Sequence, residues 1–178
     1  MMNSLETPRL LLEPQTAAHA QAMFEVLGDP AIYRYENAPP ASLEGLCERY
    51  AKLETRRSGD GHEQWLNWVL RQRSGDLIGY VQATVKADGQ AFVAYVLASA
   101  HWGQGLASEA VTAMLGELAA RYGVHTLWAV FKRANARSRR LLERLGFAAA
   151  DAADVLSLAI DADEDLMLRC IAATVPAR

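Results

Sequence analysis

A short glycine-containing segment near the middle of the chain is the part best suited to chemistry. It covers residues 103–108, contains Gly103 and Gly105, and lies between a strand-like stretch and an amphipathic, helix-like stretch. Glycine lets the backbone approach a ligand closely. The start of a helix presents unpaired N–H groups and the positive end of the helix dipole. The spacing therefore indicates an anion site suited to a phosphate group, although it equally fits a glycine-rich turn before a helix.

Two common phosphate-binding loops fit this segment poorly. A P-loop requires a lysine followed by serine or threonine after its second glycine, and the segment contains no lysine. The dinucleotide-binding fingerprint requires a glycine or alanine at its last position, where this chain has Ser108. The segment also follows an expected antiparallel meander instead of opening a βαβ unit. If it binds an anion, it does so as part of another class of site.

The elements that must position this segment form a mixed pattern along the chain. Apolar spacing and capping residues predict helices at residues 17–27, 43–57, 104–122 and 136–145. Alternation and turn residues predict strands at residues 9–12, 64–70, 77–85, 90–97, 126–131, 155–160 and 166–172. The three strands over residues 64–97 are joined by tight turns and should form an antiparallel meander. The order predicts an α+β (mixed α/β) fold around one sheet, and 178 residues fit one domain over 1–178.

Three segments, in order along the chain, resemble motifs of the GNAT N-acetyltransferase family. Residues 102–110 resemble its motif A, Gln/Arg-x-x-Gly-x-Gly/Ala, with Gly105 and Ala107 at the last two required positions and Trp102 in place of Gln or Arg. Residues 7–12 resemble the opening strand of the branch that includes the ribosomal-protein N-terminal acetyltransferases (RimJ/RimL-like). Residues 135–147, with their Leu-Gly-Phe ending, resemble its second CoA-binding helix. The resemblance spans residues 7–147.

The resemblance implies a fold and an activity. The fold would be a single GNAT-like acyl-CoA N-acyltransferase domain. Its central twisted sheet would be mostly antiparallel, with splayed parallel strands, and about four helices would flank it. The activity would be direct transfer of an acetyl group from acetyl-CoA, a co-substrate, to a primary amine. No metal takes part, and the four histidines show no metal-ligand spacing.

The resemblance also implies, residue by residue, where acetyl-CoA binds. The pantetheine arm would lie beside Val96 and Leu97, where a strand amide could act as oxyanion donor. Asn135 and Ser138 match positions that contact the CoA arm, although asparagine is also a preferred helix N-cap. The segment 132–144 holds six basic residues and one acidic residue, which is either a solvated face or, through Arg137 and Arg140, a partner for the 3′-phosphate. The loop that would hold the pyrophosphate comprises Gly103, Gln104, Gly105, Leu106, Ala107 and Ser108.

Acetyl transfer to an amine requires two proton transfers. The amine must lose a proton, and the thiolate leaving group can be helped by gaining one. Many relatives place a tyrosine donor on the second CoA-binding helix, where this chain has Leu142. Ser138 is the nearest hydroxyl and is our candidate donor. The candidates for the base are Glu36, in the loop after the first helix, and Tyr95, on the strand beside the thioester.

Composition narrows the range of partners and compartments. The net charge of −3 provides no basic field for nucleic acid. No stretch is apolar and long enough to span a membrane, and the N-terminus lacks a signal pattern. Two distant cysteines, Cys47 and Cys170, suit a reducing compartment as small buried side chains. We therefore expect a cytoplasmic protein that binds neither nucleic acid nor membranes.

The acceptor is left open by the sequence. It could be a small-molecule or a peptide amine, because the segments expected to select it, residues 29–61 and 148–172, resemble the family least. The acidic turn at residues 161–165 could attract a cationic amine or be a solvated loop. A monomer and a homodimer both fit the chain. Two other functions also fit: a CoA-binding sensor or scaffold without transferase activity, and a nucleotide-binding module of another class.

Overall fold

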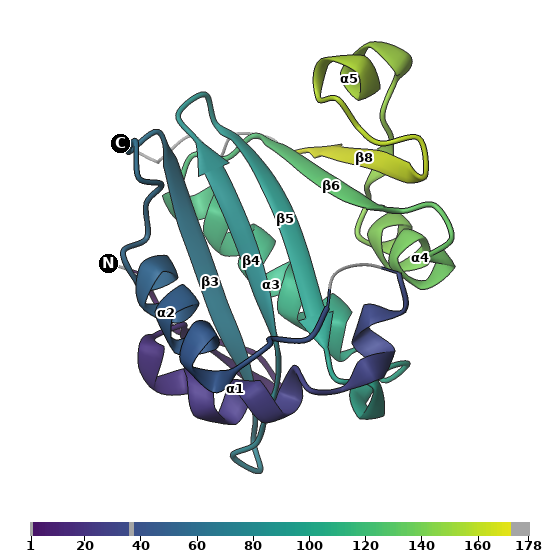
Figure 1. Cartoon of the computed structure of the whole chain (residues 1–178). Coiled ribbons are helices and arrows are strands. Elements are labelled where there is room, and N and C mark those ends of the chain that lie inside the picture. The colour runs from purple at the N-terminus through teal and green to yellow at the C-terminus, as the bar shows by residue number, and fades with distance from the viewer. Residues whose placement is uncertain (1, 36–37, 172–178) are drawn as a thin grey trace.

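One eight-stranded sheet forms the centre of the molecule (Figure 1). The computed structural model describes residues 2–35 and 38–171. The strand order is β1-β2-β3-β4-β5-β6-β8-β7, and every neighbouring pair is antiparallel except β5 and β6. This confirms the predicted meander and the mostly antiparallel α+β fold. The strands are β1 (Leu5–Glu6), β2 (Leu10–Pro14), β3 (Glu63–Gln72), β4 (Leu77–Lys86), β5 (Gln90–Leu97), β6 (Thr126–Lys132), β7 (Ala148–Ala149) and β8 (Glu164–Cys170).

The parallel pair β5 and β6 separates partway along its length. Only the first three residues of β5, Gln90 to Phe92, pair with β6, at Thr126 to Trp128. Beyond this point β6 turns away from β5 (Figure 1) and stays paired with β8 along its whole length. The second half of β5 therefore has an open edge, as the expectation of splayed parallel strands requires.

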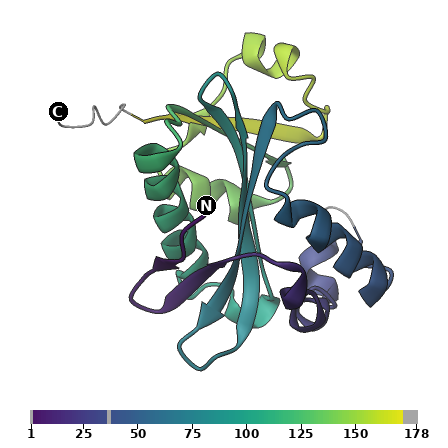
Figure 2. The same cartoon turned by 90° about the vertical axis from the view of Figure 1, so that its left-hand side faces the viewer.

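Helices cover both faces of the sheet (Figure 2). The helices α1 (Ala20–Val26) and α2 (Leu43–Glu54) lie on one face, and α3 (Leu106–Arg121) lies on the other. Two adjacent β3 residues mark the division, because Trp68 packs in the core under α3 and Val69 packs in the core with α1 and α2. The helix α4 (Ala136–Arg144) adds Leu141 and Leu142 to the α3 core, and α5 (Ala152–Ser157) follows β7.

Most of the predicted elements are confirmed, and their ends follow local capping chemistry. Ser42 caps α2 by accepting a 3.1 Å hydrogen bond from the Gly45 N–H. The predicted helix at residues 17–27 begins as a 3-10 turn, Ala17–His19, before α1. The helix predicted from residue 104 begins instead at Leu106, because Gly105 adopts a left-handed conformation that ends the loop. The last predicted strand corresponds to β8, and Ala172 lies outside the described residues.

The strand predicted at residues 155–160 is wrong. This stretch is the end of α5 and the turn after it. The Asp151 carboxylate accepts a 2.8 Å hydrogen bond from the Asp154 N–H and so starts a helix. The strand β8 pairs with β6 on one side and with β7 on the other, so both of its edges already have partners other than residues 155–160. Leu156 is 81% exposed, so the apolar run that suggested a strand is not fully buried.

Two expectations about the chain as a whole meet different outcomes. Cys47 is half-buried and Cys170 is exposed, and both are free thiols, so the expected burial of both cysteines is wrong for Cys170. Across residues 2–35 and 38–171, none of the helices has the length and apolar character needed to cross a membrane.

Candidate active site

The loop before α3 has the geometry of an anion cradle. Gly103 and Gly105 have φ values of 75° and 79°, a left-handed conformation that favours glycine. Gly105 is the N-cap of the 16-residue helix α3, and no side chain caps this end. The N–H groups of Leu106, Ala107 and Ser108 therefore lack partners within the helix and point out of its positive end. A phosphate would satisfy them, as the sequence pattern indicated.

The turn between β1 and β2, residues 7–9, holds this loop in place. Arg9 donates from Nη1 to the Gln104 carbonyl (2.8 Å) and from Nε to the Glu109 carboxylate (2.6 Å). The Thr7 hydroxyl and the Arg9 N–H donate to the other oxygen of Glu109, at 2.6 and 2.8 Å. Burial raises the pKa of Glu109, but these hydrogen bonds outweigh it, so its net pKa lies below the ordinary value. Sequence reasoning noticed residues 7–12 only as a strand motif and missed this contact.

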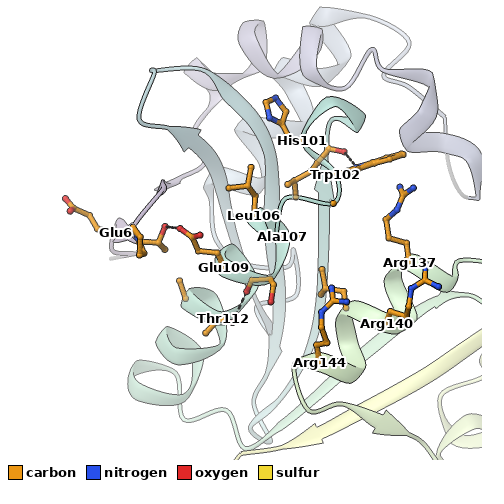
Figure 3. A pocket seen from close by; sticks show the side chains of 18 residues that line it. Glu6, His101, Trp102, Leu106, Ala107, Glu109, Thr112, Arg137, Arg140 and Arg144 are labelled. Atoms are coloured by element: carbon orange, nitrogen blue, oxygen red, sulfur yellow. Dashed lines mark hydrogen bonds between the residues drawn. The ribbon is translucent and has the colours of Figure 1, made fainter.

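A cavity of about 880 Å³, here called the donor cavity, opens over the loop and the start of α3 (Figure 3). Its lining includes Gly103, Gly105, Ala107 and Ser108 from the loop and helix start. Three arginines of α4 line the opposite side and point toward the loop (Figure 3). They are Arg137, Arg140 and Arg144. The predicted shared face of these arginines therefore meets the predicted anion loop.

The basic residues of segment 132–144 fall into two groups. One group is neutralised: Lys132 binds Asp163 and Glu164, each at 3.1 Å, and both Arg133 and Arg139 bind Asp165. The acidic turn thus pairs with the protein's own basic residues, an outcome that neither interpretation of it foresaw. The other group consists of Arg137, Arg140 and Arg144, and none of them forms an ion pair with a described residue. Arg137 stacks over the Trp102 ring, with its Cζ atom 3.9 Å from the ring centroid.

A second cavity of about 910 Å³, here called the acceptor cavity, lies beside the donor cavity. Five residues line both: Leu97, Trp102, Ala107, Arg137 and Arg140. From there the lining continues along the gap between β5 and β6 and under α2. A molecule held at the cradle can therefore extend its other end into this gap.

The open edge of β5 offers backbone hydrogen-bonding groups to this cavity. Successive residues of a strand turn their N–H and C=O groups to opposite sides. The Gly89 carbonyl accepts from Thr126 on the β6 side, and the Ala98 N–H donates to Ile78 on the β4 side. By alternation, Val93 and Tyr95 present their backbone groups to the open side. Val96 turns its carbonyl toward Gly79 of β4, where any side chain would clash with it, and Val96 also lines the cavity.

Two of the three catalytic candidates are in contact. The Tyr95 hydroxyl lies 2.7 Å from the Ser138 Oγ, and both residues line the acceptor cavity. Ser138 is fixed because its N–H donates to the Asn135 side chain at 3.1 Å, which makes Asn135 the N-cap of α4. Burial raises the pKa of Tyr95, and the hydrogen bond between the two hydroxyls lowers it by a smaller amount. The sequence named both residues but gave no sign that they meet.

A half-buried aspartate, Asp29, anchors the far wall of the acceptor cavity. The Asp29 carboxylate accepts from the Ser99 N–H at 2.6 Å and from the Ala31 N–H at 2.9 Å. The hydrogen bond from the Ser99 backbone is the main reason that the pKa of Asp29 is lowered. Asp29 thereby ties the 3-10 turn Pro30–Arg34, which lines the cavity, to the end of β5.

The remaining candidates have separate outcomes. Glu36 lies outside the described residues. Leu142, at the position where relatives carry a tyrosine, is 1% exposed and packs in the core. His101 lines the donor cavity. Within the part of the chain that the structure describes, no three His, Cys, Asp or Glu side chains gather as metal ligands would.

Comparison with known proteins places this arrangement in a family. Residues 9–148 match the family described as acetyltransferase (GNAT) domain. The chain belongs to the GNAT family. It is therefore an acetyl-CoA-dependent N-acetyltransferase.

Individual relatives agree with this membership. An uncharacterized N-acetyltransferase of Bacillus subtilis, YoaA, is 26% identical over 150 residues, which cover 83% of this chain and 84% of that protein. The RimL ribosomal L7/L12 alpha-N-protein acetyltransferase, solved with CoA, has a TM-score of 0.79 at 15% identity, covering 96% of this chain and 99% of that one. The ribosomal-protein-S5-alanine acetyltransferase of Vibrio fischeri has a TM-score of 0.79 at 17% identity, covering 98% and 100%. At these identities the two structures show that this GNAT chain shares their fold.

Proposed function

We propose that this GNAT protein transfers the acetyl group of acetyl-CoA directly to a primary amine, with acetyl-CoA in the donor cavity and the amine in the acceptor cavity. The observation that carries the proposal is the meeting of the two cavities. An anion cradle lies on one side of their shared wall, and the hydroxyl pair of Tyr95 and Ser138 lies on the other.

The residues of the donor cavity fit acetyl-CoA. The N–H groups of Leu106, Ala107 and Ser108 suit the pyrophosphate, and Gly103 and Gln104 complete the loop. Of the three α4 arginines that line the cavity, Arg140 and Arg144 are available to bind the 3′-phosphate, because Arg137 stacks on Trp102. Backbone groups of Val93 and Tyr95 are available to amides of the pantetheine arm, as an added strand would use them. Once bound, acetyl-CoA supplies an activated acetyl thioester.

Proton transfer in this site assigns different roles to the candidates. Transfer forms a bond between the amine nitrogen and the acetyl carbon and breaks the bond to sulfur, so the amine loses a proton and the sulfur gains one. A raised pKa keeps Tyr95 protonated, which suits a donor better than the base that the sequence suggested. We assign Tyr95 and Ser138 as a donor pair. Glu36 stays the prediction for the base.

The lining of the acceptor cavity supports direct transfer. Its described residues include no cysteine and no histidine. Ser138 contacts a tyrosine instead of a general base, so nothing in this lining activates it as a nucleophile. An amine aligned against the thioester needs no covalent intermediate, because alignment itself gives a large rate gain.

The test uses the full chain with acetyl-CoA and a panel of small amines and N-terminal peptides. Release of free thiol is followed together with the mass of each amine. The proposal expects thiol release that depends on an acceptor and yields its N-acetylated form. Tight acetyl-CoA binding with no release from any acceptor would instead favour a CoA-binding sensor. Release without an acetylated amine would also overturn the proposal.

A further inference from the structure

Two buried polar groups in the acceptor cavity have no partner within the described protein. They are the Nε2 of Gln15 and the hydroxyl of Tyr50. Gln15 is 2% exposed and Tyr50 is 3% exposed, and both line the cavity. Buried polar groups are nearly always hydrogen-bonded, because leaving one unpaired is costly. These two therefore indicate a position where a bound molecule completes the hydrogen bonding.

The two groups belong to a polar patch built by three elements. Gln15 follows β2, and its backbone N–H donates to the Asn67 carbonyl of β3 at 2.9 Å. Asn67 is 3% exposed and also lines the cavity. Tyr50 reaches the cavity from α2, within the core that α1 and α2 share. The patch lies on the α2 side of the acceptor cavity, and none of its residues lines the donor cavity.

Both unpaired groups are hydrogen-bond donors. The Nε2 of glutamine can only donate. Burial raises the pKa of Tyr50, with a smaller contribution from Tyr80, and Arg49 opposes the rise without cancelling it. The Tyr50 hydroxyl therefore keeps its proton and can donate it to an acceptor atom. The complementary group on a ligand is an oxygen that accepts hydrogen bonds, which a protonated amine lacks.

The charge of the cavity indicates that this oxygen is anionic. The described lining carries four arginines and no aspartate or glutamate. Arg137 and Arg140 belong to the wall shared with the donor cavity, whereas Arg34 and Arg49 line the acceptor cavity alone. Arg49 precedes Tyr50 on α2, and both residues line this cavity. An anionic group is thus favoured here, and a polycationic amine is disfavoured.

We propose that the acceptor is an amine that also carries a carboxylate, and that Gln15, Tyr50 and Arg49 bind this carboxylate. The inference rests on the proposed function and names its substrate class. The same chemistry is offered by a free amino acid and by a peptide with an acidic residue beside its N-terminal amine. Bidentate or charge-assisted binding of this kind would orient the amine toward the thioester.

The experiment compares matched acceptors at a fixed saturating level of acetyl-CoA. One arm uses glutamate, methionine and phenylalanine, each as the free acid and as its carboxamide. The other uses short peptides with aspartate or asparagine in the second position. We expect kcat/KM to be about tenfold higher for the acid of at least one matched pair. The arm that shows this preference identifies the source of the carboxylate.

The outcomes separate this inference from the proposed function. Equal or faster reaction of every carboxamide and of the asparagine peptide would overturn the inference and leave acetyl transfer intact. Absence of thiol release with every acceptor would contradict the proposed function instead.

Two variants test the residues. Tyr50→Phe removes only the buried hydroxyl, and Arg49→Gln changes an exposed side chain. Each should raise KM for the acid acceptor about tenfold and KM for the carboxamide less, because an amide oxygen also accepts hydrogen bonds but carries no charge, while KM for acetyl-CoA stays unchanged. Lys52→Gln, on the same helix but outside the cavity lining, is the matched control and should change neither. Equal effects of both variants on acid and carboxamide would assign Tyr50 and Arg49 a merely structural role.

Discussion

The donor and acceptor cavities share a wall but are built in different ways. The donor cavity takes its chemistry from backbone N–H groups at the start of α3 and from arginines on one face of α4. The acceptor cavity takes its chemistry from side chains at the end of β2 and on α2, β3, β5 and α4, which meet only in the fold. The first arrangement binds phosphate groups mainly through backbone N–H groups at a helix start, which many different sequences can provide. The second is particular to this chain, so the acceptor must be inferred from it alone.

The largest effect is expected at the cradle. Gly105→Val places a β-branched residue at a φ of 79°, which valine tolerates badly. The loop must then move its N–H groups away from the phosphate position. We expect acetyl-CoA affinity, measured by calorimetry, to fall roughly tenfold to a hundredfold, since a non-glycine residue there costs about 1–2 kcal/mol before any hydrogen bond is lost.

A second glycine of the same helix provides the control. Gly116 lies on the exposed side of α3, and an added Cβ would contact nothing within 4 Å. Gly116→Ala should leave acetyl-CoA affinity unchanged and stabilise the helix by up to about 1 kcal/mol. Equal losses in both variants would show that α3 is sensitive to any change, and the cradle would lose its special role.

The next effect concerns the acceptor side. Tyr95→Phe and Ser138→Ala each break the 2.7 Å contact between the two hydroxyls. If they form the proton donor, each should lower kcat roughly tenfold to a hundredfold, toward the lower end of general acid catalysis, with a much smaller change in acetyl-CoA affinity, since the cradle that binds the pyrophosphate is intact. Because the two act as one unit, the double variant should lose little more than either single variant. Steady-state kinetics with direct binding measurements separates the two quantities.

The pH profile tests the assigned direction of proton transfer. A donor must be protonated, so its contribution is present below its pKa and is lost as pH rises through it. Burial places the pKa of Tyr95 above its ordinary value, so kcat should hold up to at least about pH 10 before this group limits it. A decline in wild-type kcat that begins well below that pH and is absent in Tyr95→Phe would contradict the assignment.

Local patterns accounted for the donor side of the fold and site. The left-handed glycines, the amphipathic run of α3 and the Asn135 cap are each set by a few consecutive residues, so the sequence could predict them. The meander followed from tight turns between apolar runs for the same reason. The wrong strand prediction at residues 155–160 also has a local cause, because the Asp151 carboxylate caps α5 and the apolar run after it begins within this helix.

Contacts between distant segments could not be predicted. Arg9 and Glu109 are 100 positions apart, and Tyr95 and Ser138 are 43 apart. No periodicity links such pairs, because their meeting depends on how the sheet brings β2, β5, α3 and α4 together. The buried donors of Gln15 and Tyr50 are invisible for the same reason: burial and the absence of a partner are properties of the assembled cavity.

A smaller effect divides the two groups of basic residues. Arg140→Ala and Arg144→Ala remove unpaired charges from the donor cavity, whereas Arg133→Ala removes a residue already bound to Asp165. We expect each of the first two to weaken acetyl-CoA binding about fivefold, since an exposed charge contributes modestly. Both should lose this effect when 3′-dephospho-CoA is the ligand. Arg133→Ala should match the wild type with either ligand, and an equal loss in all three variants would point to general charge instead of a phosphate contact.

The smallest effect concerns the contact between the turn that joins β1 to β2 and the cradle. Glu109 is 15% exposed and accepts hydrogen bonds from Thr7 and Arg9, and its pKa lies below the ordinary value of 4.5. Its ionised form therefore stabilises the fold above that value, and the stabilisation is lost as pH falls through the lowered pKa. Since Arg9 is 49% exposed, we expect Glu109→Gln to cost only about 1 kcal/mol at neutral pH by urea unfolding. The difference from the wild type should shrink as the pH falls through the lowered pKa of Glu109, because the protonated carboxyl is neutral like the glutamine amide. Glu25→Gln, an exposed change on α1, should show no difference at either pH. A Glu109→Gln penalty that persists unchanged at low pH would mean that the carboxylate charge does not hold the turn to the cradle.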